Sequence, residues 1–383
     1  MTRVQPRPED FLELVERSKR GRLKLYMGFA AGVGKTYRML EEAHALQKRG
    51  TDVVIGFIET HGRAETAALL EGLEIVPRRR VEYRGFTVEE MDLDAILARH
   101  PAVAIVDELP HTNPPGSRHN KRYQDVEEIL NSGINVIGAL NIQHLESLKD
   151  IVERATGVVI RETVPDAFLK KADQIVNLDL AIEDLVDRLK SGKIYAAEKV
   201  GTALENFFRQ ENLAALRELA LREVAESVDR TASIHTSGGG DERRATAERV
   251  MVCVASRSPR GVALLRRGSR LAGRLNTDWF AVYVETPGEA PNRIDSAVQR
   301  QLIATISMAK ELGAEVVRLQ SHDVVTALLD FARTHGVGHI VIGRSERPWW
   351  KRILGRGMID RLVHEARGFD LHIVSLDDKE ARE

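Results

Sequence analysis

The chain has 383 residues, of which 43% are apolar and 30% are charged, and this composition is typical of a globular protein with two or three domains. Its formal net charge is −1, so no bulk field attracts nucleic acid, and no apolar run approaches the roughly 18 residues of a membrane span. These features predict a cytoplasmic protein without a membrane span or a nucleic-acid partner.

Short apolar runs alternate with segments of helical periodicity from residue 23 to about residue 178. Because neighbouring positions within each run are apolar, the runs resemble strands that are buried on both faces. The pattern predicts an α/β domain in which helices cover a parallel sheet. The predicted strands are residues 23–29, 52–60, 102–108, 134–140 and 174–179.

A glycine-rich turn follows the first of these runs and opens a helix predicted over residues 35–48. Such a turn points backbone N–H groups at a bound phosphate. Lys35 would bring positive charge to the β- and γ-phosphates, and the Thr36 hydroxyl is a ligand for Mg²⁺. The pattern predicts an ATP site, with an unrelated glycine turn as the alternative. The predicted nucleotide-binding residues are Gly32, Val33, Gly34, Lys35, Thr36 and Tyr37.

This turn departs from the full phosphate-loop pattern at one position. The first glycine of the pattern is expected five residues before Gly34, where the chain has Phe29, and Gly28 stands one residue too early. The departure lies outside the Gly-Val-Gly-Lys-Thr end, which is the part that contacts phosphate. We therefore expect the loop to bind phosphate.

Two acidic residues, Asp107 and Glu108, end the third predicted strand. In a phosphate-loop fold, Asp107 at this place would hold Mg²⁺, and Glu108 would orient or deprotonate a nucleophile. Two solvated acids at the end of a strand are the alternative. Because the acids belong to the same α/β unit as the glycine turn, the sequence predicts a joint site for ATP and Mg²⁺.

Further polar side chains follow the predicted strands, at the edge where open α/β sheets bind ligands. Gln143 and Arg63 are the candidates selected to reach a γ-phosphate or its attacking water, and a solvated or structural role is the alternative. The full set is Glu59, His61, Arg63, His111, Asn113, Arg118, Asn141, Gln143 and His144.

The pattern becomes purely helical from about residue 181 to residue 230. Two interpretations remain open for this segment: it packs on the first domain, or residues 212–230 pair with a partner helix in a homodimer. Residues 231–248 contain three consecutive glycines and no apolar period, which predicts a flexible linker between the first domain, residues 1–230, and a second one.

A second α/β domain is predicted over residues 249–378, followed by a charged tail at 379–383. Five apolar runs alternate with helical segments, which again indicates a parallel, doubly wound sheet. The runs are residues 249–255, 278–285, 315–320, 339–343 and 371–376.

Several long stretches of the sequence resemble the N-terminal cytoplasmic region of the KdpD potassium-sensor family, whose members are sensor histidine kinases. The stretches are residues 32–40, 53–66, 106–113, 115–130 and 140–150, and the likeness continues through 172–195 and 212–225. The resemblance implies a KdpD-type phosphate-loop domain and a universal-stress-protein-like second domain. Full-length family members continue into transmembrane helices and a histidine-kinase core, so we expect this chain to be a short form or a fragment.

The resemblance also implies a function and partners. The chain would be an ATP- and Mg²⁺-binding sensory and regulatory module of a two-component system that controls the Kdp potassium uptake system. Its partners would be a response regulator, the sensor-kinase core or subunits of the potassium pump, and it would lie in the cytoplasm at the inner face of the membrane. The alternative is a phosphate-loop enzyme, an ATPase or a serine/threonine protein kinase acting on a partner such as the pump. In that enzyme Lys35, Glu108, Gln143 and Arg63 would be catalytic.

Some members of the family bind cyclic di-AMP in the second domain through a Ser-x-Ser pair and a later aromatic strand. Ser256 and Ser258, followed by Trp279 and Tyr283, resemble that pattern, although Phe280 replaces a threonine. The alternative is an ordinary core strand in which the aromatic residues pack. ATP is not expected here, because residues 346 and 358 lack the glycine and the hydroxyl of the nucleotide-binding loop in this domain type.

Overall fold

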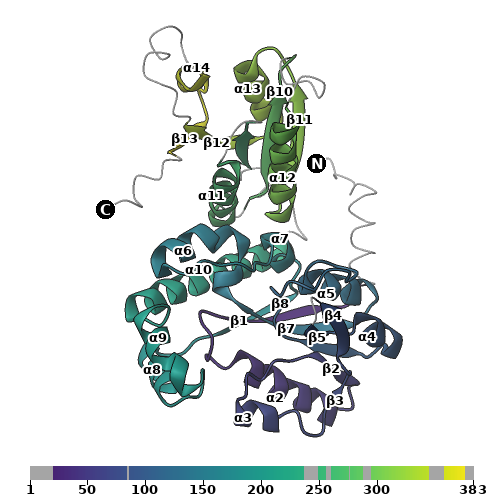
Figure 1. Cartoon of the computed structure of the whole chain (residues 1–383). Helices are drawn as coiled ribbons and strands as arrows, with labels where there is room; N and C mark the ends of the chain where they lie inside the picture. Colours follow the sequence, from purple (N-terminus) through teal and green to yellow (C-terminus); the bar gives the residue numbers. More distant parts are fainter. Residues whose placement is uncertain are drawn as a thin grey trace. The chain divides into compact units, whose positions relative to one another are not determined.

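The computed structural model describes residues 20–83, 86–236, 249–255, 260–275, 277–287, 295–344 and 358–375. These residues form two compact units that divide near residue 224 (Figure 1). In the described parts of the chain, no helix combines the length and the apolar character needed to cross a membrane.

The first unit is built on a sheet of six parallel strands in the order β3-β2-β6-β7-β1-β8. This confirms the predicted fold class, and all five predicted strands are present. Strand β3 and an antiparallel hairpin, β4–β5, were not predicted, because charged residues such as Arg79, Arg80 and Glu82 interrupt their apolar pattern. The strands are β1 (Leu23–Gly28), β2 (Val53–Phe57), β3 (Glu74–Ile75), β4 (Arg79–Tyr83), β5 (Phe86–Glu90), β6 (Val103–Val106), β7 (Asn135–Asn141) and β8 (Gln174–Leu178).

Helices cover both faces of this sheet (Figure 1). Alternate residues of β1 point to opposite faces, so that Leu23 and Leu25 join one cluster of buried side chains and Tyr26 joins the other. The Tyr26 face is covered by α2 (Lys35–Lys48) and α3 (Ala64–Ala68). The opposite face is covered by α4 (Leu93–Arg99), α5 (Arg122–Asn131), α6 (Lys149–Thr156) and α7 (Asp166–Leu169), with two 3₁₀ turns, η1 (Ile142–His144) and η2 (Glu146–Leu148), after β7.

The helical segment after β8 forms α8 (Ile182–Lys190), α9 (Ala197–Glu205) and α10 (Gln210–Thr236). Leu185 of α8 and Leu213 of α10 are fully buried in the core of the first unit, so this segment packs on that unit, as one of the two interpretations proposed. The homodimer through residues 212–230 stays a prediction. Helix α10 extends through Thr236, into the segment 231–248 that is expected to be a linker.

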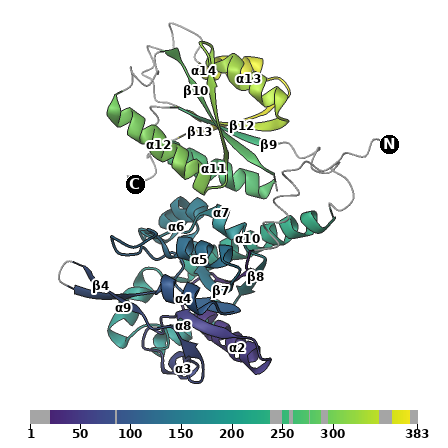
Figure 2. The same ribbon diagram turned by 90° about the vertical axis from the view of Figure 1, so that its right-hand side faces the viewer.

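The second unit has five parallel strands in the order β11-β10-β9-β12-β13, which again confirms the predicted class. Helices α11 (Gly261–Arg274) and α12 (Ser296–Glu311) cover one face, while α13 (Val324–Thr334) and α14 (Met358–Glu365) cover the other (Figure 2). The strands are β9 (Arg249–Val254), β10 (Trp279–Glu285), β11 (Glu315–Gln320), β12 (Val337–Arg344) and β13 (Asp370–Ser375).

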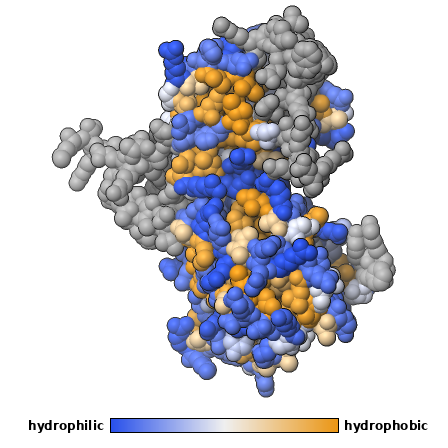
Figure 3. All heavy atoms as spheres, turned by 90° about the vertical axis from the view of Figure 1, so that its left-hand side faces the viewer, coloured by the Kyte–Doolittle hydropathy of each residue, from blue (hydrophilic) through white to orange (hydrophobic). Residues whose placement is uncertain are grey.

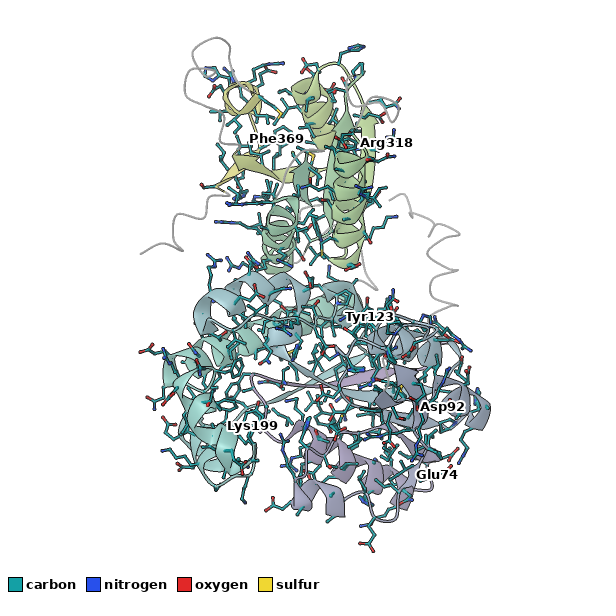
Figure 4. The ribbon with its side chains drawn as sticks, in the orientation of Figure 1. Glu74, Asp92, Tyr123, Lys199, Arg318 and Phe369 are labelled. Carbon is teal, nitrogen blue, oxygen red and sulfur yellow. The ribbon has the colours of Figure 1, made fainter. Side chains whose placement is uncertain are left out.

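Hydrophobic patches interrupt the hydrophilic surface on the face shown in Figure 3. Exposed apolar side chains occur in both units, for example Val159 in the first and Ile303 in the second. Such scattered exposure is normal for folded proteins. Among the side chains drawn in Figure 4, Asp92 accepts a hydrogen bond from the Ala95 amide at 3.0 Å and so caps the N-terminus of α4.

Candidate functional site

The glycine-rich loop connects the end of β1 at Gly28 with the start of α2 at Lys35. Gly32 and Gly34 have φ angles of +91° and +102°, a region that residues with a side chain rarely adopt. Gly34 immediately precedes α2, whose first backbone N–H groups have no partner within the helix. Positive φ angles just before a helix N-terminus create a turn of amides that suits a phosphate.

Gly28 explains how the loop tolerates Phe29 in place of the usual first glycine. A Cβ atom on Gly28 would lie 2.5 Å from Val33 Cγ2 and 3.4 Å from Lys35 Nζ, so the loop passes directly over this residue. The Phe29 side chain, only 1% exposed, is part of the core instead. The close contact with Val33 and Lys35 that requires a glycine therefore occurs at residue 28, one residue before the position where the usual pattern has its first glycine.

Lys35 lies buried beneath the loop. Its ammonium donates hydrogen bonds to the Ala30 carbonyl, at 3.2 Å, and to the Asn141 side-chain oxygen at the end of β7. Burial lowers the pKa of Lys35 to about 8, against the opposing effect of the nearby Asp107 and Glu108 charges. A phosphate beside this ammonium would favour its charged form.

Thr36 and Asp107 are brought into contact although they are 71 positions apart. The Thr36 hydroxyl donates to Asp107 Oδ2 at 2.8 Å, and Asp107 Oδ1 accepts from the Glu108 amide at 2.8 Å. Burial, and secondly the charge of Glu108, raise the pKa of Asp107. A hydroxyl and a buried carboxylate side by side are oxygen ligands of the kind that Mg²⁺ binds.

Glu108 has a φ of +54°, which is uncommon for a residue other than glycine. Its carbonyl accepts hydrogen bonds from the His111 amide at 3.0 Å and from the Arg122 guanidinium at 3.4 Å, and these bonds hold the turn. The side chain is 45% exposed and lies 3.4 Å from His61 Nε2. The hydrogen bond to His61 lowers the pKa of Glu108, so it carries its negative charge at neutral pH.

Arg63 and Gln143 both hold polar atoms that have no hydrogen-bond partner in the described part of the protein. These atoms are the buried Arg63 Nε and the buried Gln143 Oε1. Arg63 Nη2 donates to the Ile194 carbonyl at 3.4 Å, and Gln143 Nε2 lies 3.4 Å from His144 Nε2. Burial lowers the pKa of Arg63, although Asp107 and Glu108 act in the opposite direction. Buried polar atoms without partners are rare in folded proteins and are a recognised feature of functional sites.

The remaining predicted residues of the loop have simpler surroundings. Val33 is buried in the core, and Tyr37, in the first turn of α2, is 39% exposed. His111 binds Glu90 Oε1 at 2.8 Å, and Arg118 forms an ion pair with Glu128 at 2.6 Å. The side chains of His111 and Arg118 are therefore engaged in contacts with carboxylates of the fold.

Sequence reasoning missed the contribution of the segment from α8 to residue 195. Arg188 Nη1 donates to the Gly32 carbonyl at 3.1 Å, and the Ile194 side chain packs on Gly32. The bond between Asn141 and Lys35 is likewise absent from the sequence pattern, which places Asn141 only as a polar residue after a strand. No local pattern could reveal these contacts, since Arg188 lies 156 positions from Gly32.

In the second unit, Ser256 and Ser258 fall outside the described residues. Trp279 and Tyr283 are 1% and 4% exposed within β10, and Trp279 lies close to Gly268 of α11. Cyclic di-AMP as a ligand of this unit stays a prediction.

Comparison with known proteins gives consistent relatives. The model of the KdpD family, described as the osmosensitive K⁺ channel His kinase sensor domain, matches residues 19–228. The sensor protein KdpD of Escherichia coli K12 is 45% identical over 381 residues, which are 99% of this chain and 42% of that protein. The putative sensor protein KdpD of Synechocystis is 46% identical over 359 residues, covering 93% of this chain and 95% of that protein.

Solved structures of universal stress proteins are also similar to part of the chain. One, a complex with cAMP, is 21% identical, with a TM-score of 0.27, and covers 34% of this chain and 98% of its own. Another, from Archaeoglobus fulgidus in complex with dAMP, is 18% identical with a TM-score of 0.25 and covers 33% of this chain and 96% of its own.

Proposed function

The chain belongs to the KdpD sensor family, and from this premise we propose that its first unit is a cytoplasmic sensory module that binds ATP with Mg²⁺. The observation that carries the proposal is the meeting of Lys35, Thr36 and Asp107 at the carboxyl edge of one parallel sheet. A cation, a hydroxyl and a carboxylate beside a glycine turn are the groups that bind a nucleoside triphosphate and its metal ion.

Each of these groups has a distinct task in the proposed complex. The loop amides hold the β-phosphate, and the buried Lys35 ammonium contributes charge to the β- and γ-phosphates. Thr36 and Asp107 would hold Mg²⁺, which would supply positive charge to the phosphates. The charge of Mg²⁺ offsets the unfavourable burial of the Asp107 carboxylate.

Nucleotide occupancy would then act as a signal. Arg63 and Gln143 lie after other strands of the sheet and hold unpartnered polar atoms, so a γ-phosphate could order their loops. We propose that this ordering changes contacts with a response regulator, a sensor-kinase core or potassium-pump subunits in a potassium-responsive two-component system. The chain spans 42% of the Escherichia coli relative, and the activity and partners of that longer protein are part of the proposal.

A second candidate function is phosphoryl transfer, and the backbone and charge of Glu108 favour it. Glu108 is an ionised carboxylate held in a strained backbone conformation next to Asp107, which we propose to hold the metal. It would accept a proton from water in an ATPase, or from a protein hydroxyl in a kinase. The oxygen that loses this proton would form a bond to the γ-phosphorus while the bond from that phosphorus to the departing ADP oxygen breaks. Glu108→Gln separates the two functions.

The test is an assay with γ-³²P-ATP and Mg²⁺, with and without partner proteins, that follows binding, free phosphate and labelled protein together. Lys35→Ala should weaken ATP binding by about 10- to 100-fold, because it removes the buried ammonium that we propose to hold the phosphates. Lys48→Ala, at the exposed end of the same helix, is the matched control and should bind normally.

The outcomes separate the proposals. Binding that depends on Lys35 without phosphate release or transfer supports a nucleotide sensor. Release or transfer that disappears in Glu108→Gln, while binding persists, supports the enzyme. Wild-type protein that does not bind ATP would contradict both.

A further inference from the structure

The segment from α8 to residue 195 passes over the glycine-rich loop. A Cβ atom on Gly32 would lie 2.2 Å from Ile194 Cδ1 and 3.2 Å from Leu185 Cδ1, so these side chains leave no space above that glycine. Leu185 and Ile194 are themselves buried, with 0% and 2% of their surface exposed. The segment is therefore packed on the loop and is not a loose connection.

The same segment also reaches the loop that follows β2. The Ile194 carbonyl accepts a hydrogen bond from Arg63 Nη2 at 3.4 Å, and Lys193 pairs with Glu65 at 3.2 Å. Tyr195 lies within electrostatic range of both Arg63 and Glu108. The chain after α8 consequently spans the space between the glycine loop and the edge that carries Glu108.

Arg188 is the cation that this segment places at the glycine loop. Its Nη1 atom donates to the Gly32 carbonyl at 3.1 Å and lies 3.9 Å from the position of a Cβ atom on Gly34. The guanidinium thus extends across the turn from one glycine to the next. Its side chain is exposed, and within the described part of the chain its bond to the neutral Gly32 carbonyl leaves most of its five N–H donors available for another acceptor.

We propose that Arg188 contacts the phosphate chain of the bound nucleotide and makes the site prefer ATP to ADP. The inference rests on the proposed ATP site. A planar guanidinium can donate two parallel hydrogen bonds to two oxygens of one phosphate, whereas the Gly32 carbonyl offers a single oxygen. A terminal phosphate therefore competes with Gly32 for this side chain. Because the segment continues from Arg188 toward Arg63 and Glu108, Arg188 would contact the phosphate that lies nearest the sheet edge carrying Glu108.

This contact would join nucleotide binding to the helical extension. Arg188 belongs to α8, and α10 is fixed to the same edge of the sheet by a bidentate ion pair between Arg217 and Asp179, at 2.7 and 2.5 Å. A phosphate that draws Arg188 from Gly32 acts directly on α8. The position of the helical extension, α8 to α10, would then depend on whether the third phosphate is present.

The test compares the affinities of the full chain for Mg-ATP and Mg-ADP by titration calorimetry. Arg188→Ala should weaken ATP binding about tenfold, the loss of one charge-assisted hydrogen bond, and should change ADP binding by less than about twofold. Arg188→Lys keeps the charge without the planar fork and should give an intermediate loss. Arg222→Ala is the matched control, since Arg222 is an exposed arginine of α10 whose ion pair with Glu218 runs along its own helix.

A loss of equal size for ATP and ADP in Arg188→Ala, or no loss for either, would overturn the inference and leave the ATP site standing. Lys35→Ala should weaken both nucleotides together, which distinguishes failure of the site from failure of its selectivity. If the wild-type chain binds neither nucleotide, the proposed function and this inference both fall.

Discussion

At the scale of single residues, the geometry of the candidate site depends on three glycines that meet different demands. Gly28 allows the loop to cross closely above it, Gly32 and Gly34 adopt positive φ angles, and Gly32 also lies under Ile194. The sequence pattern predicts a tight glycine turn, and glycine adopts the positive φ angles of that turn without steric cost. It does not predict the contact with Ile194, which comes from a distant segment.

Gly32→Ala should therefore destabilise the protein more than an ordinary glycine substitution. The positive φ alone costs about 1–2 kcal/mol for alanine, and the new Cβ atom would overlap Ile194 in addition. Gly50→Ala is the matched control, since Gly50 has a φ of +80° and no heavy atom lies within 4 Å of the place its new Cβ atom would take. Urea denaturation of both variants checks this, and equal free energies of unfolding would show that Ile194 simply moves aside.

At the scale of secondary-structure elements, a buried ion pair connects the hairpin to the strand end that carries Asp107 and Glu108. Arg122, at the start of α5, is 1% exposed and donates to Glu90 Oε2 at 2.9 Å, at the end of β5. The Arg122 guanidinium also lies 3.7 Å from the centre of the Phe57 ring and donates to the Glu108 carbonyl. This one side chain thus supports the turn in which Glu108 adopts its positive φ.

Arg122→Ala should lower the free energy of unfolding by about 3–5 kcal/mol, because it leaves the Glu90 carboxylate buried without its guanidinium partner. Arg118→Ala, which removes an exposed arginine from the neighbouring loop, is the control and should change stability little. Chemical denaturation measures both. A small effect of Arg122→Ala would mean that His111 alone satisfies Glu90.

The buried Glu90–Arg122 pair also makes the free energy of unfolding depend on pH. Burial raises the pKa of Glu90, but the hydrogen bond from His111 and the charge of Arg122 outweigh it, so the pKa lies below its ordinary value. A carboxyl group whose pKa is lowered by folding contributes its full stabilisation at pH values above its ordinary pKa of 4.5. This contribution is lost as the pH falls through the lower pKa of the folded protein. The Arg122→Ala variant should lose less stability over that acidic range than the wild type.

At the scale of the whole molecule, each unit has its own hydrophobic core. Among the described residues, two clusters of buried apolar side chains belong to the first unit and two others to the second. A unit with its own core can fold alone. The first unit also contains every described residue of the candidate ATP site.

A fragment comprising residues 1–236 should therefore fold and bind ATP with the affinity of the full chain. Its end at Thr236 keeps α10 whole, because a shorter fragment would cut through that helix. Calorimetric titration of the fragment and of the full chain provides the comparison. A large loss of affinity in the fragment would place part of the site, or its stabilisation, in the second unit.

The fold could be predicted from the sequence where a strand carries apolar residues at successive positions. All ten predicted strands correspond to strands of the two sheets, since apolar residues at successive positions are a local signal. The hairpin β4–β5 could not be predicted in this way, because Arg79, Glu82 and Glu89 give it a polar pattern.

The strand, the glycine-rich turn and the helix after it could be derived from the sequence alone, together with the two acids that follow β6. These features depend on the conformations and charges of consecutive residues, so they can be read locally. The folded structure was needed to show that Asn141 binds Lys35, that Arg122 supports Glu108 and that Arg188 reaches Gly32. Those contacts arise because β7 lies between β1 and β6, and because the chain returns after β8 to cover the loop. Strand order and helix packing are set by the burial of the whole core, and no periodicity within one segment encodes them.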